Sequence, residues 1–153
     1  MTATLQMGPQ LMTPAPDFSA FNHDNQVLTL EDLMGERGLV LGFTDDIWEP
    51  ASVRRVMWFQ RHFTQFCGLN IQLALLICNE PHVLNGFALS SAVPLDFPLL
   101  SDIDLTVHRQ YNMESHAGLL VIDSAYVIRD KWIMPEERVW PKAPELMSVL
   151  EAL

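Results

Sequence analysis

Two apolar stretches separated by an amphipathic pattern constrain the fold of this chain more than any other feature. The stretches, Leu39–Phe43 and Ile71–Cys78, are typical of strands that are covered on both faces. From Pro50 to Gly68, apolar residues recur at spacings of three and four, as on one side of a helix, and polar residues such as Arg55 fall mainly on the other side. A strand, a helix and a second strand predict a βαβ unit, in which the two strands are parallel and the crossover is right-handed.

The flanking segments predict the rest of a mixed sheet. Strand-forming segments on either side of the turn residues 22–25 indicate a β-hairpin, and Thr29 is expected to cap a short helical turn. An antiparallel pair of strands is expected around residues 123–125. The predicted fold class is therefore α/β, with a central mixed sheet flanked by helices and preceded by an N-terminal hairpin. Further helices are predicted at residues 83–89, 105–111 and 143–153.

Length and charge restrict the domain organisation and the partners. The chain has 153 residues, of which 49% are hydrophobic, and this suits one domain at residues 14–153 behind a flexible arm at residues 1–13. The net charge of −10 disfavours binding to nucleic acid or to anionic membranes, because both require clustered Lys and Arg. No apolar stretch approaches the ~20 residues of a membrane span. The first ten residues lack a signal-peptide pattern, so the expected location is the cytoplasm.

The two cysteines, Cys67 and Cys78, are expected to be reduced thiols in that compartment. They flank the second apolar strand, whose ends lie about 25 Å apart at ~3.3 Å per residue, whereas a disulfide needs Cα atoms within ~7 Å. No Cys or His cluster has the spacing of zinc ligands, so neither a metal nor a cofactor is expected.

The segment between the first apolar strand and the helix is the candidate site. In open α/β sheets the carboxyl ends of parallel strands line the ligand crevice, so the end of the second strand should lie beside this segment. Glu49 is interpreted first as a carboxylate that favours the positive end of the helix. The alternative is a cluster of Asp45, Asp46 and Glu49 that binds a cation. The expected crevice residues are Thr44, Asp45, Asp46, Trp48, Glu49 and Cys78.

Several segments outside this site resemble one protein family. Residues 14–18 resemble the A-P-D-F opening of the AhpC/TSA family, and residues 27–35 resemble the segment before its first core strand. Residues 97–102, followed by Tyr111, and residues 119–123 are similar to two later segments of that family. The resemblance implies a thioredoxin-like fold with an N-terminal hairpin, as in peroxiredoxin-like and redoxin proteins. It also implies antioxidant thiol peroxidase or thiol–disulfide oxidoreductase activity, and dimers.

The chain departs from this resemblance at the redox site. Thiol oxidoreductases of this fold carry a Trp-Cys-Pro-x-Cys motif where the strand meets the helix. Here Trp48 and Pro50 match the motif, and the two cysteine positions are Glu49 and Ser52. Ala117 stands where the family commonly has an Arg or a cis-Pro. A carboxylate cannot form a sulfenic acid or a disulfide, so these three substitutions predict that the cysteine chemistry has been lost.

Together these observations favour a redox-inactive binding or interaction module with the AhpC/TSA fold. One alternative is a peroxidase or oxidoreductase that has moved its nucleophile to Cys78, and another is a small-ligand binder that uses the vacated crevice. A homodimer is expected, because four Trp, eight Phe and eight Met are many large apolar residues for so small a domain. Trp48 and Trp58 are the candidate contact residues, and Trp58 could instead belong to the core.

Overall fold

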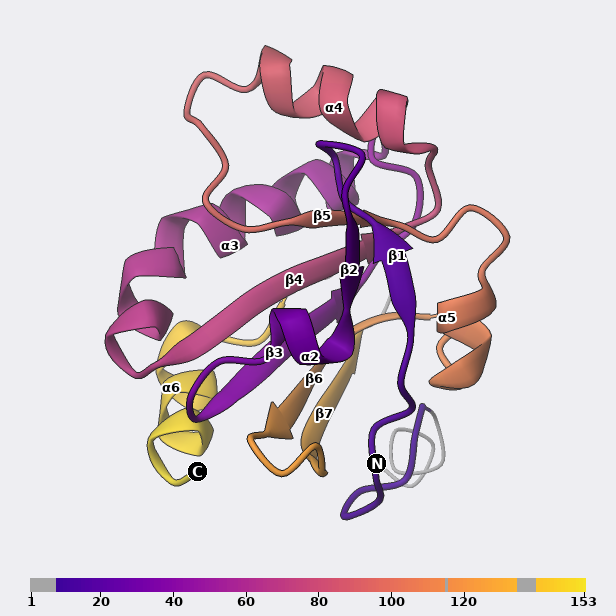
Figure 1. Cartoon of the computed structure of the whole chain (residues 1–153). Helices are drawn as coiled ribbons and strands as arrows, with labels where there is room; N and C mark the ends of the chain where they lie inside the picture. Colours follow the sequence, from indigo (N-terminus) through magenta and orange to yellow (C-terminus); the bar gives the residue numbers. More distant parts are fainter. Residues whose placement is uncertain (1–7, 115, 135–139) are drawn as a thin grey trace.

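A five-stranded sheet with the order β5-β4-β3-β6-β7 forms the centre of the protein, and a separate hairpin, β1-β2, lies over one face (Figure 1). The computed structural model describes residues 8–114, 116–134 and 140–153. No helix among these residues is long and apolar enough to cross a membrane. The strands are β1 (Ser19–Phe21), β2 (Val27–Thr29), β3 (Gly38–Phe43), β4 (Ile71–Ile77), β5 (Leu99–Ser101), β6 (Ala117–Asp123) and β7 (Ile128–Met134); the helices are α2 (Leu30–Leu33), α3 (Pro50–Gly68), α4 (Pro81–Ser90), α5 (Thr106–Gln110) and α6 (Ala143–Glu151).

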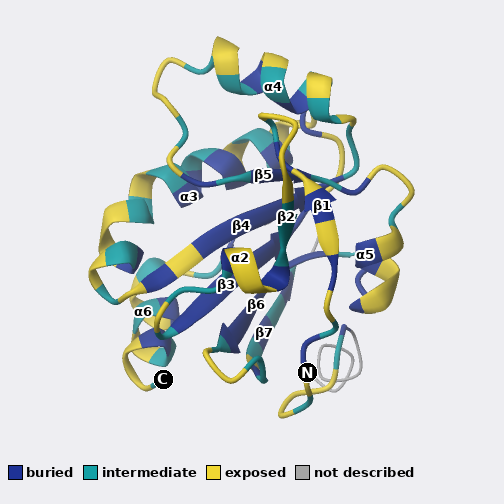
Figure 2. Cartoon of the chain, viewed as in Figure 1, coloured by how far each residue is buried: buried dark blue, intermediate teal, exposed yellow. Residues whose placement is uncertain are grey.

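The predicted βαβ unit forms the middle of the sheet. β3 and β4 run parallel, with Gly38 opposite Ile71 and Phe43 opposite Leu76, and α3 connects them. Every residue of β3 is buried (Figure 2), as expected for a strand that is covered on both faces. β6 pairs antiparallel with β3, and β7 pairs antiparallel with β6. The prediction of a thioredoxin-like mixed sheet with an N-terminal hairpin is therefore confirmed.

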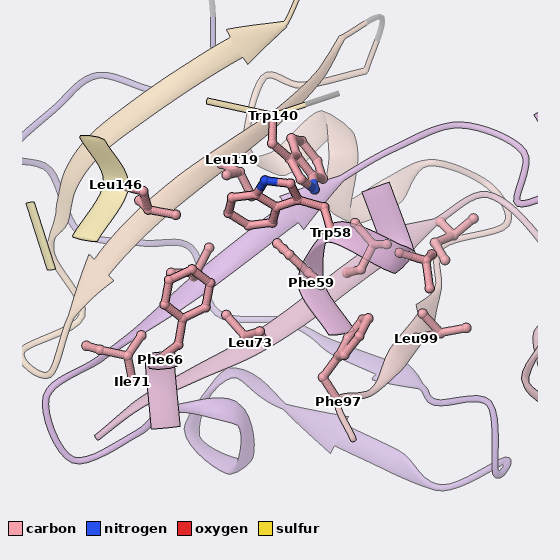
Figure 3. Close-up of a cluster of buried hydrophobic side chains, with 14 of the residues drawn as sticks. Trp58, Phe59, Phe66, Ile71, Leu73, Phe97, Leu99, Leu119, Trp140 and Leu146 are labelled. Atoms are coloured by element: carbon pink, nitrogen blue, oxygen red, sulfur yellow. The ribbon is translucent and has the colours of Figure 1, made fainter. Parts of the chain in front are cut away.

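Two hydrophobic clusters pack on the two faces of the sheet. Alternate strand residues contribute to each, because successive side chains of a strand point to opposite faces. Phe59 and Phe66 of α3 pack with Leu146 of α6 in one cluster (Figure 3). Phe18 of the hairpin region and Tyr111, directly after α5, belong to the other cluster. The sheet therefore has α3 and α6 on one face, and the hairpin, α2 and α5 on the other.

Trp58 belongs to the first of these clusters, so the alternative of a core residue holds and a dimer contact does not. The residue is only 9% exposed. Its ring centroid lies 5.8 Å from those of Phe59 and Phe66 and 6.4 Å from that of Trp140. Trp140 follows far along the chain and covers the edge of α3 that the helix alone would leave exposed.

The N-terminal segment is hydrogen-bonded to the start of β7 at Met12 and Thr13. The N–H of Met12 donates to the carbonyl of Ile128 at 2.7 Å, and the N–H of Ile128 donates to the carbonyl of Thr13 at 3.0 Å. Met12 and Thr13 therefore have backbone partners on β7, and the flexibility of the arm stays a prediction. Residues 1–7 lie outside the described residues.

A buried carboxylate holds the start of α5. Asp102 accepts hydrogen bonds from the backbone N–H groups of Val107 (3.0 Å) and His108 (2.8 Å) and from the Nδ1–H of His108 (2.6 Å). The Asp102 and His108 side chains are 4% and 2% exposed. Burial acts to raise the pKa of Asp102, but these hydrogen bonds outweigh it and hold the pKa below its ordinary value.

We expect Asp102→Asn to destabilise the protein and to flatten its acid denaturation. A carboxylate whose pKa is lowered by folding stabilises the folded state above its unfolded pKa of about 3.9. That contribution is lost as the pH falls through the folded-state pKa. The substitution should lower the free energy of unfolding at pH 7 by about 1–3 kcal/mol.

Urea unfolding over a series of pH values measures both effects. Asp104→Asn is the matched control, because Asp104 lies two residues further along and is exposed. Equal acid dependence in the wild type and in Asp102→Asn would contradict this role of the carboxylate.

Candidate functional site

The loop from β3 to α3 is held by Asn79, which follows β4. Asn79 Oδ1 accepts the N–H of Ile47 at 2.7 Å, and Asn79 Nδ2 donates to Asp46 Oδ1 at 3.2 Å. The same Asp46 oxygen accepts the N–H of Trp48 at 3.0 Å. Asn79 is not among the site residues predicted from the sequence. The available signal was its place directly beyond the second apolar strand, at the edge of the sheet where the candidate crevice was expected.

Glu49 is the N-cap residue of α3. Its backbone is extended (φ −67°, ψ 136°), and its carbonyl accepts the N–H of Val53 at 3.1 Å. The side chain is exposed and makes no capping hydrogen bond. The carboxylate can therefore favour α3 only through the electrostatic field at the helix N-terminus, as the first interpretation of Glu49 requires.

Thr44 and Ser52 belong to a buried polar cluster and not to an open crevice. Thr44 Oγ1 and Ser52 Oγ are 2.9 Å apart, and Arg55 Nη1 donates to Thr44 Oγ1 at 2.8 Å. All three residues are at most 2% exposed. The prediction of Thr44 as a crevice residue is therefore wrong, because its hydroxyl is occupied inside this cluster.

Arg55 is buried, although the helical pattern predicts it among the polar residues on the outer side of α3. Its guanidinium lies 5.4 Å from the ring centroid of Trp140, whose indole N–H donates to the carbonyl of Arg55 at 3.2 Å. Burial lowers the pKa of Arg55, and the nearby carboxylate of Asp45 acts in the opposite direction. A sequence signal existed: Arg55 precedes Phe59 by four residues, which places both on one side of the helix.

Cys78 lies directly beyond β4 and is a half-buried free thiol. Burial raises the pKa of this thiol, and the carboxylates of Asp46, Asp45 and Asp102 raise it further, while a backbone hydrogen bond acts in the opposite direction. Cys78 therefore lies near the expected crevice residues. Reactive thiolates occur in electropositive surroundings, and the surroundings of Cys78 are electronegative.

The exposed part of the site consists of Trp48, Asp45, Asp46 and Glu49. Trp48 is 56% exposed, and its ring contacts Phe87 of α4 edge to face, with the centroids 5.4 Å apart. Within the described ranges, no group of three or more His, Cys, Asp or Glu side chains is placed to hold a metal ion. The three carboxylates therefore do not converge on a common point, and the exposed site is an aromatic ring among separate negative charges.

Ala117 is the first residue of β6 and lies opposite Met134 of β7. It is 8% exposed and offers no polar side-chain group. No cis peptide bond occurs in the described part of the chain. Ala117 therefore cannot supply the guanidinium that the resemblance implies at this position. A guanidinium does lie at the β3–α3 junction, but it belongs to Arg55 of α3 and is hydrogen-bonded to Thr44.

Solved structures with the same fold include several peroxiredoxins. The reduced 2-Cys peroxiredoxin of Plasmodium vivax aligns with a TM-score of 0.81 over 93% of this chain and 94% of that chain, at 16% identity. Peroxidoxin BcpB of Mycobacterium tuberculosis aligns with a TM-score of 0.82 over 97% of this chain and 99% of that chain, at 19% identity. At these identities the likeness shows the shared fold.

Two relatives named peroxiredoxin 2 are similar in sequence. That of Caldanaerobacter subterraneus subsp. tengcongensis is 26% identical over 156 residues, which cover 95% of this chain and 70% of the relative. That of Picrophilus torridus is 26% identical over 133 residues, which cover 80% of this chain and 65% of the relative. The chain thus spans 65–70% of the length of these two relatives. Residues 11–135 match the AhpC/TSA family, and since this match takes in most of the thioredoxin-like sheet, the chain belongs to the AhpC/TSA family.

Proposed function

We propose that this AhpC/TSA-family protein is a redox-inactive binding or interaction module. The proposal rests on Glu49, which is the N-cap residue of α3 and which the resemblance to thiol oxidoreductases places at the first cysteine of their motif. A carboxylate there has no route through a sulfenic acid or a disulfide. Ser52 would need a general base to act as a nucleophile, and its hydroxyl is paired with that of Thr44.

A nucleophile relocated to Cys78 is the rival proposal. Peroxidatic thiolates are stabilised by helix N-termini and by neighbouring cations. The neighbouring charges that act on Cys78 are carboxylates, and they raise its pKa together with burial. A thiol in this setting stays protonated at neutral pH, and this supports the redox-inactive interpretation over the enzyme.

The proposed binding surface consists of the exposed residues of the β3–α3 junction. Asp45, Asp46 and Glu49 give it negative charge, and Trp48 gives it a large apolar contact. Complementary charge favours a cationic ligand or partner. A small-ligand binder would use the same surface together with Cys78. We further propose a cytoplasmic location, because two free thiols suit a reducing compartment.

We also propose that the protein forms a homodimer whose contact includes Trp48. Exposed Trp residues are frequent anchors of interfaces. The Trp48 ring is supported from behind by Phe87 of α4, and Leu89 of the same helix is 79% exposed. An exposed aromatic ring held in one orientation loses little conformational freedom on association.

Purified protein should show no thiol-dependent turnover of hydrogen peroxide or alkyl hydroperoxides. The physical reason is that Glu49 and Ser52 carry no thiol and that the surroundings of Cys78 do not stabilise a thiolate. Peroxide consumption coupled to a thioredoxin or glutathione system measures this, and Cys67→Ser is the matched control for Cys78→Ser. If turnover occurs and is abolished by Cys78→Ser but preserved in Cys67→Ser, the result would support the rival proposal of an enzyme with Cys78 as its nucleophile.

Glu49→Gln should lower the free energy of unfolding by at most about 1 kcal/mol, because the side chain acts on α3 only through the field at its N-terminus. Arg55→Ala in the same helix should cost about 2–3 kcal/mol, because it removes a hydrogen bond from a charged group as well as packing. Urea unfolding compares the two variants. Thermal stabilisation of the wild type by Ca²⁺ or Mg²⁺ that Glu49→Gln abolishes would instead indicate a cation site.

Light scattering at micromolar concentration should give about twice the 17.4 kDa mass of the monomer. Trp48→Ala should shift the protein toward the monomer, because it removes the central apolar contact of the proposed interface. Met12→Ala is the matched control, since Met12 is 66% exposed and lies far along the chain from this surface. A monomeric wild type would refute the dimer, and a dimer that survives Trp48→Ala would refute the interface.

A further inference from the structure

The tip of the β1–β2 hairpin, residues 22–26, is docked against β5 and α4 (Figure 1). Asn22 forms an antiparallel bridge with Leu100 of β5. The Nδ2 group of Asn85 on α4 donates to the carbonyl of His23 at 3.0 Å. The side chain of His23 is 14% exposed, and it lines a cavity of about 450 Å³ together with the first turn of α4. The hairpin tip therefore connects an outer strand of the main sheet to a helix.

The imidazole of His23 accepts a hydrogen bond from the backbone of β5. The N–H of Leu99 donates to Nδ1 of His23 at 3.2 Å. A backbone N–H can only donate, so Nδ1 must offer a lone pair, and the proton of the neutral ring lies on Nε2. The Oδ2 atom of Asp24 lies 3.9 Å from that Nε2, on the side where this tautomer presents its proton. The docked tip therefore requires the neutral form of the ring.

Protonation of His23 is incompatible with this contact. A solvent proton that binds to Nδ1 turns the acceptor into a donor, so two N–H groups would face each other. The imidazolium has to turn away from Leu99, whose N–H then loses its partner, and an unpaired backbone donor at a partly buried position is unfavourable. Histidine ordinarily changes charge between about pH 5 and pH 8. Mild acid therefore favours release of the tip.

The charged groups near the ring lie on the tip itself, on α4 and ahead of β5. Asp24 favours the protonated ring, but its side chain is 63% exposed, and an ion pair in water is weak. On α4, His82 lines the same cavity and pairs with Glu80 at 3.1 Å, and the helix N-terminus disfavours a further cation. The strand β5 carries no titratable side chain, and Asp96 ahead of it is hydrogen-bonded to α3. Among the described residues, these groups provide no strong partner for an imidazolium in the docked position.

We propose that His23 makes the docking of the hairpin tip sensitive to pH. The tip is held on β5 and α4 while the imidazole is neutral, and it is released when Nδ1 takes up a proton. Release leaves the N–H of Leu99 and the amide of Asn85 to the solvent and opens the cavity between the tip and α4. The device is independent of the proposed binding role, since it involves neither Glu49 nor Cys78.

NMR spectroscopy of the full-length protein tests both parts of the proposal. Nitrogen-15 spectra of the His23 ring at about pH 8 should show the proton on Nε2 and a free Nδ1. Hydrogen exchange of the Leu99 amide, corrected for its intrinsic rate at each pH, measures docking. Its protection factor should fall at least about fivefold between about pH 8 and pH 5, because one hydrogen bond is lost. The amide of Thr44, which donates to the carbonyl of Leu76 in the core, should keep its protection.

His23→Asn separates the acceptor from the titration. The side-chain oxygen of Asn accepts an N–H but does not take up a proton in this range, and Asn is well suited to turns. The variant should keep the protection of Leu99 at pH 8 within about twofold of the wild type and lose its fall at pH 5. His82→Asn is the matched control, because His82 lines the same cavity, is 76% exposed and pairs with Glu80. This control should retain the pH dependence of the wild type.

The proposal is overturned if the protection of Leu99 does not change with pH in the wild type, or if His23→Asn keeps the same pH dependence. A proton found on Nδ1 at pH 8 would also overturn it. Loss of protection at Thr44 to the same extent as at Leu99 would indicate destabilisation of the whole domain by acid, and this would overturn the proposed local release.

Discussion

β3 is buried on both faces, and this burial fixes its register in the sheet. Its alternate side chains belong to two separate hydrophobic clusters, so a shift of one residue would exchange the faces. The register of β3 is therefore fixed, and the loop that follows Phe43 begins at the carboxyl edge of the sheet. Asn79 from the end of β4 then holds this loop through Asp46 and Ile47, and α3 begins at Pro50.

The same backbone arrangement can support very different chemistry. A helix N-terminus at the carboxyl end of a buried strand stabilises negative charge, whether a thiolate or a carboxylate. In this chain the residue at that point is Glu49. Ser52, one turn later, is buried and hydrogen-bonded to Thr44. The fold of the AhpC/TSA family is thus retained around a junction that presents carboxylates and a buried hydroxyl pair, and we propose that this junction does not undergo redox cycling. This contrast supports the proposal of a binding role.

Local sequence patterns were sufficient to predict the fold. The apolar runs of β3 and β4 and the repeat of α3 depend on residues close together in the chain, so their order and direction could be derived without the structure. The sequence left Trp58 open between core and interface because one of its ring partners, Trp140, lies far along the chain. The hydrogen bonds of Met12 and Thr13 to Ile128 were missed for a similar reason, since they depend on the free edge of a distant strand.

The polar part of the site was harder to predict than the core. Arg55 and Asn79 acquire their roles from partners on other elements, and single-residue polarity suggests only that they are exposed. The buried pair of Asp102 and His108 likewise forms when the loop after β5 meets the start of α5. Periodicity indicates which face of an element is apolar, but it does not show which polar side chains are paired beneath that face.

The central claim is that the electrostatic environment at the carboxyl edge of this sheet no longer supports a reactive thiolate. The most direct test is the thiol pKa of Cys78, measured from the pH dependence of its alkylation by iodoacetamide in the Cys67→Ser variant. Burial together with the carboxylates of Asp46 and Asp45 should hold the pKa above the ordinary thiol value of about 8.5. A pKa below about 7, in the range of reactive thiolates, would contradict the account.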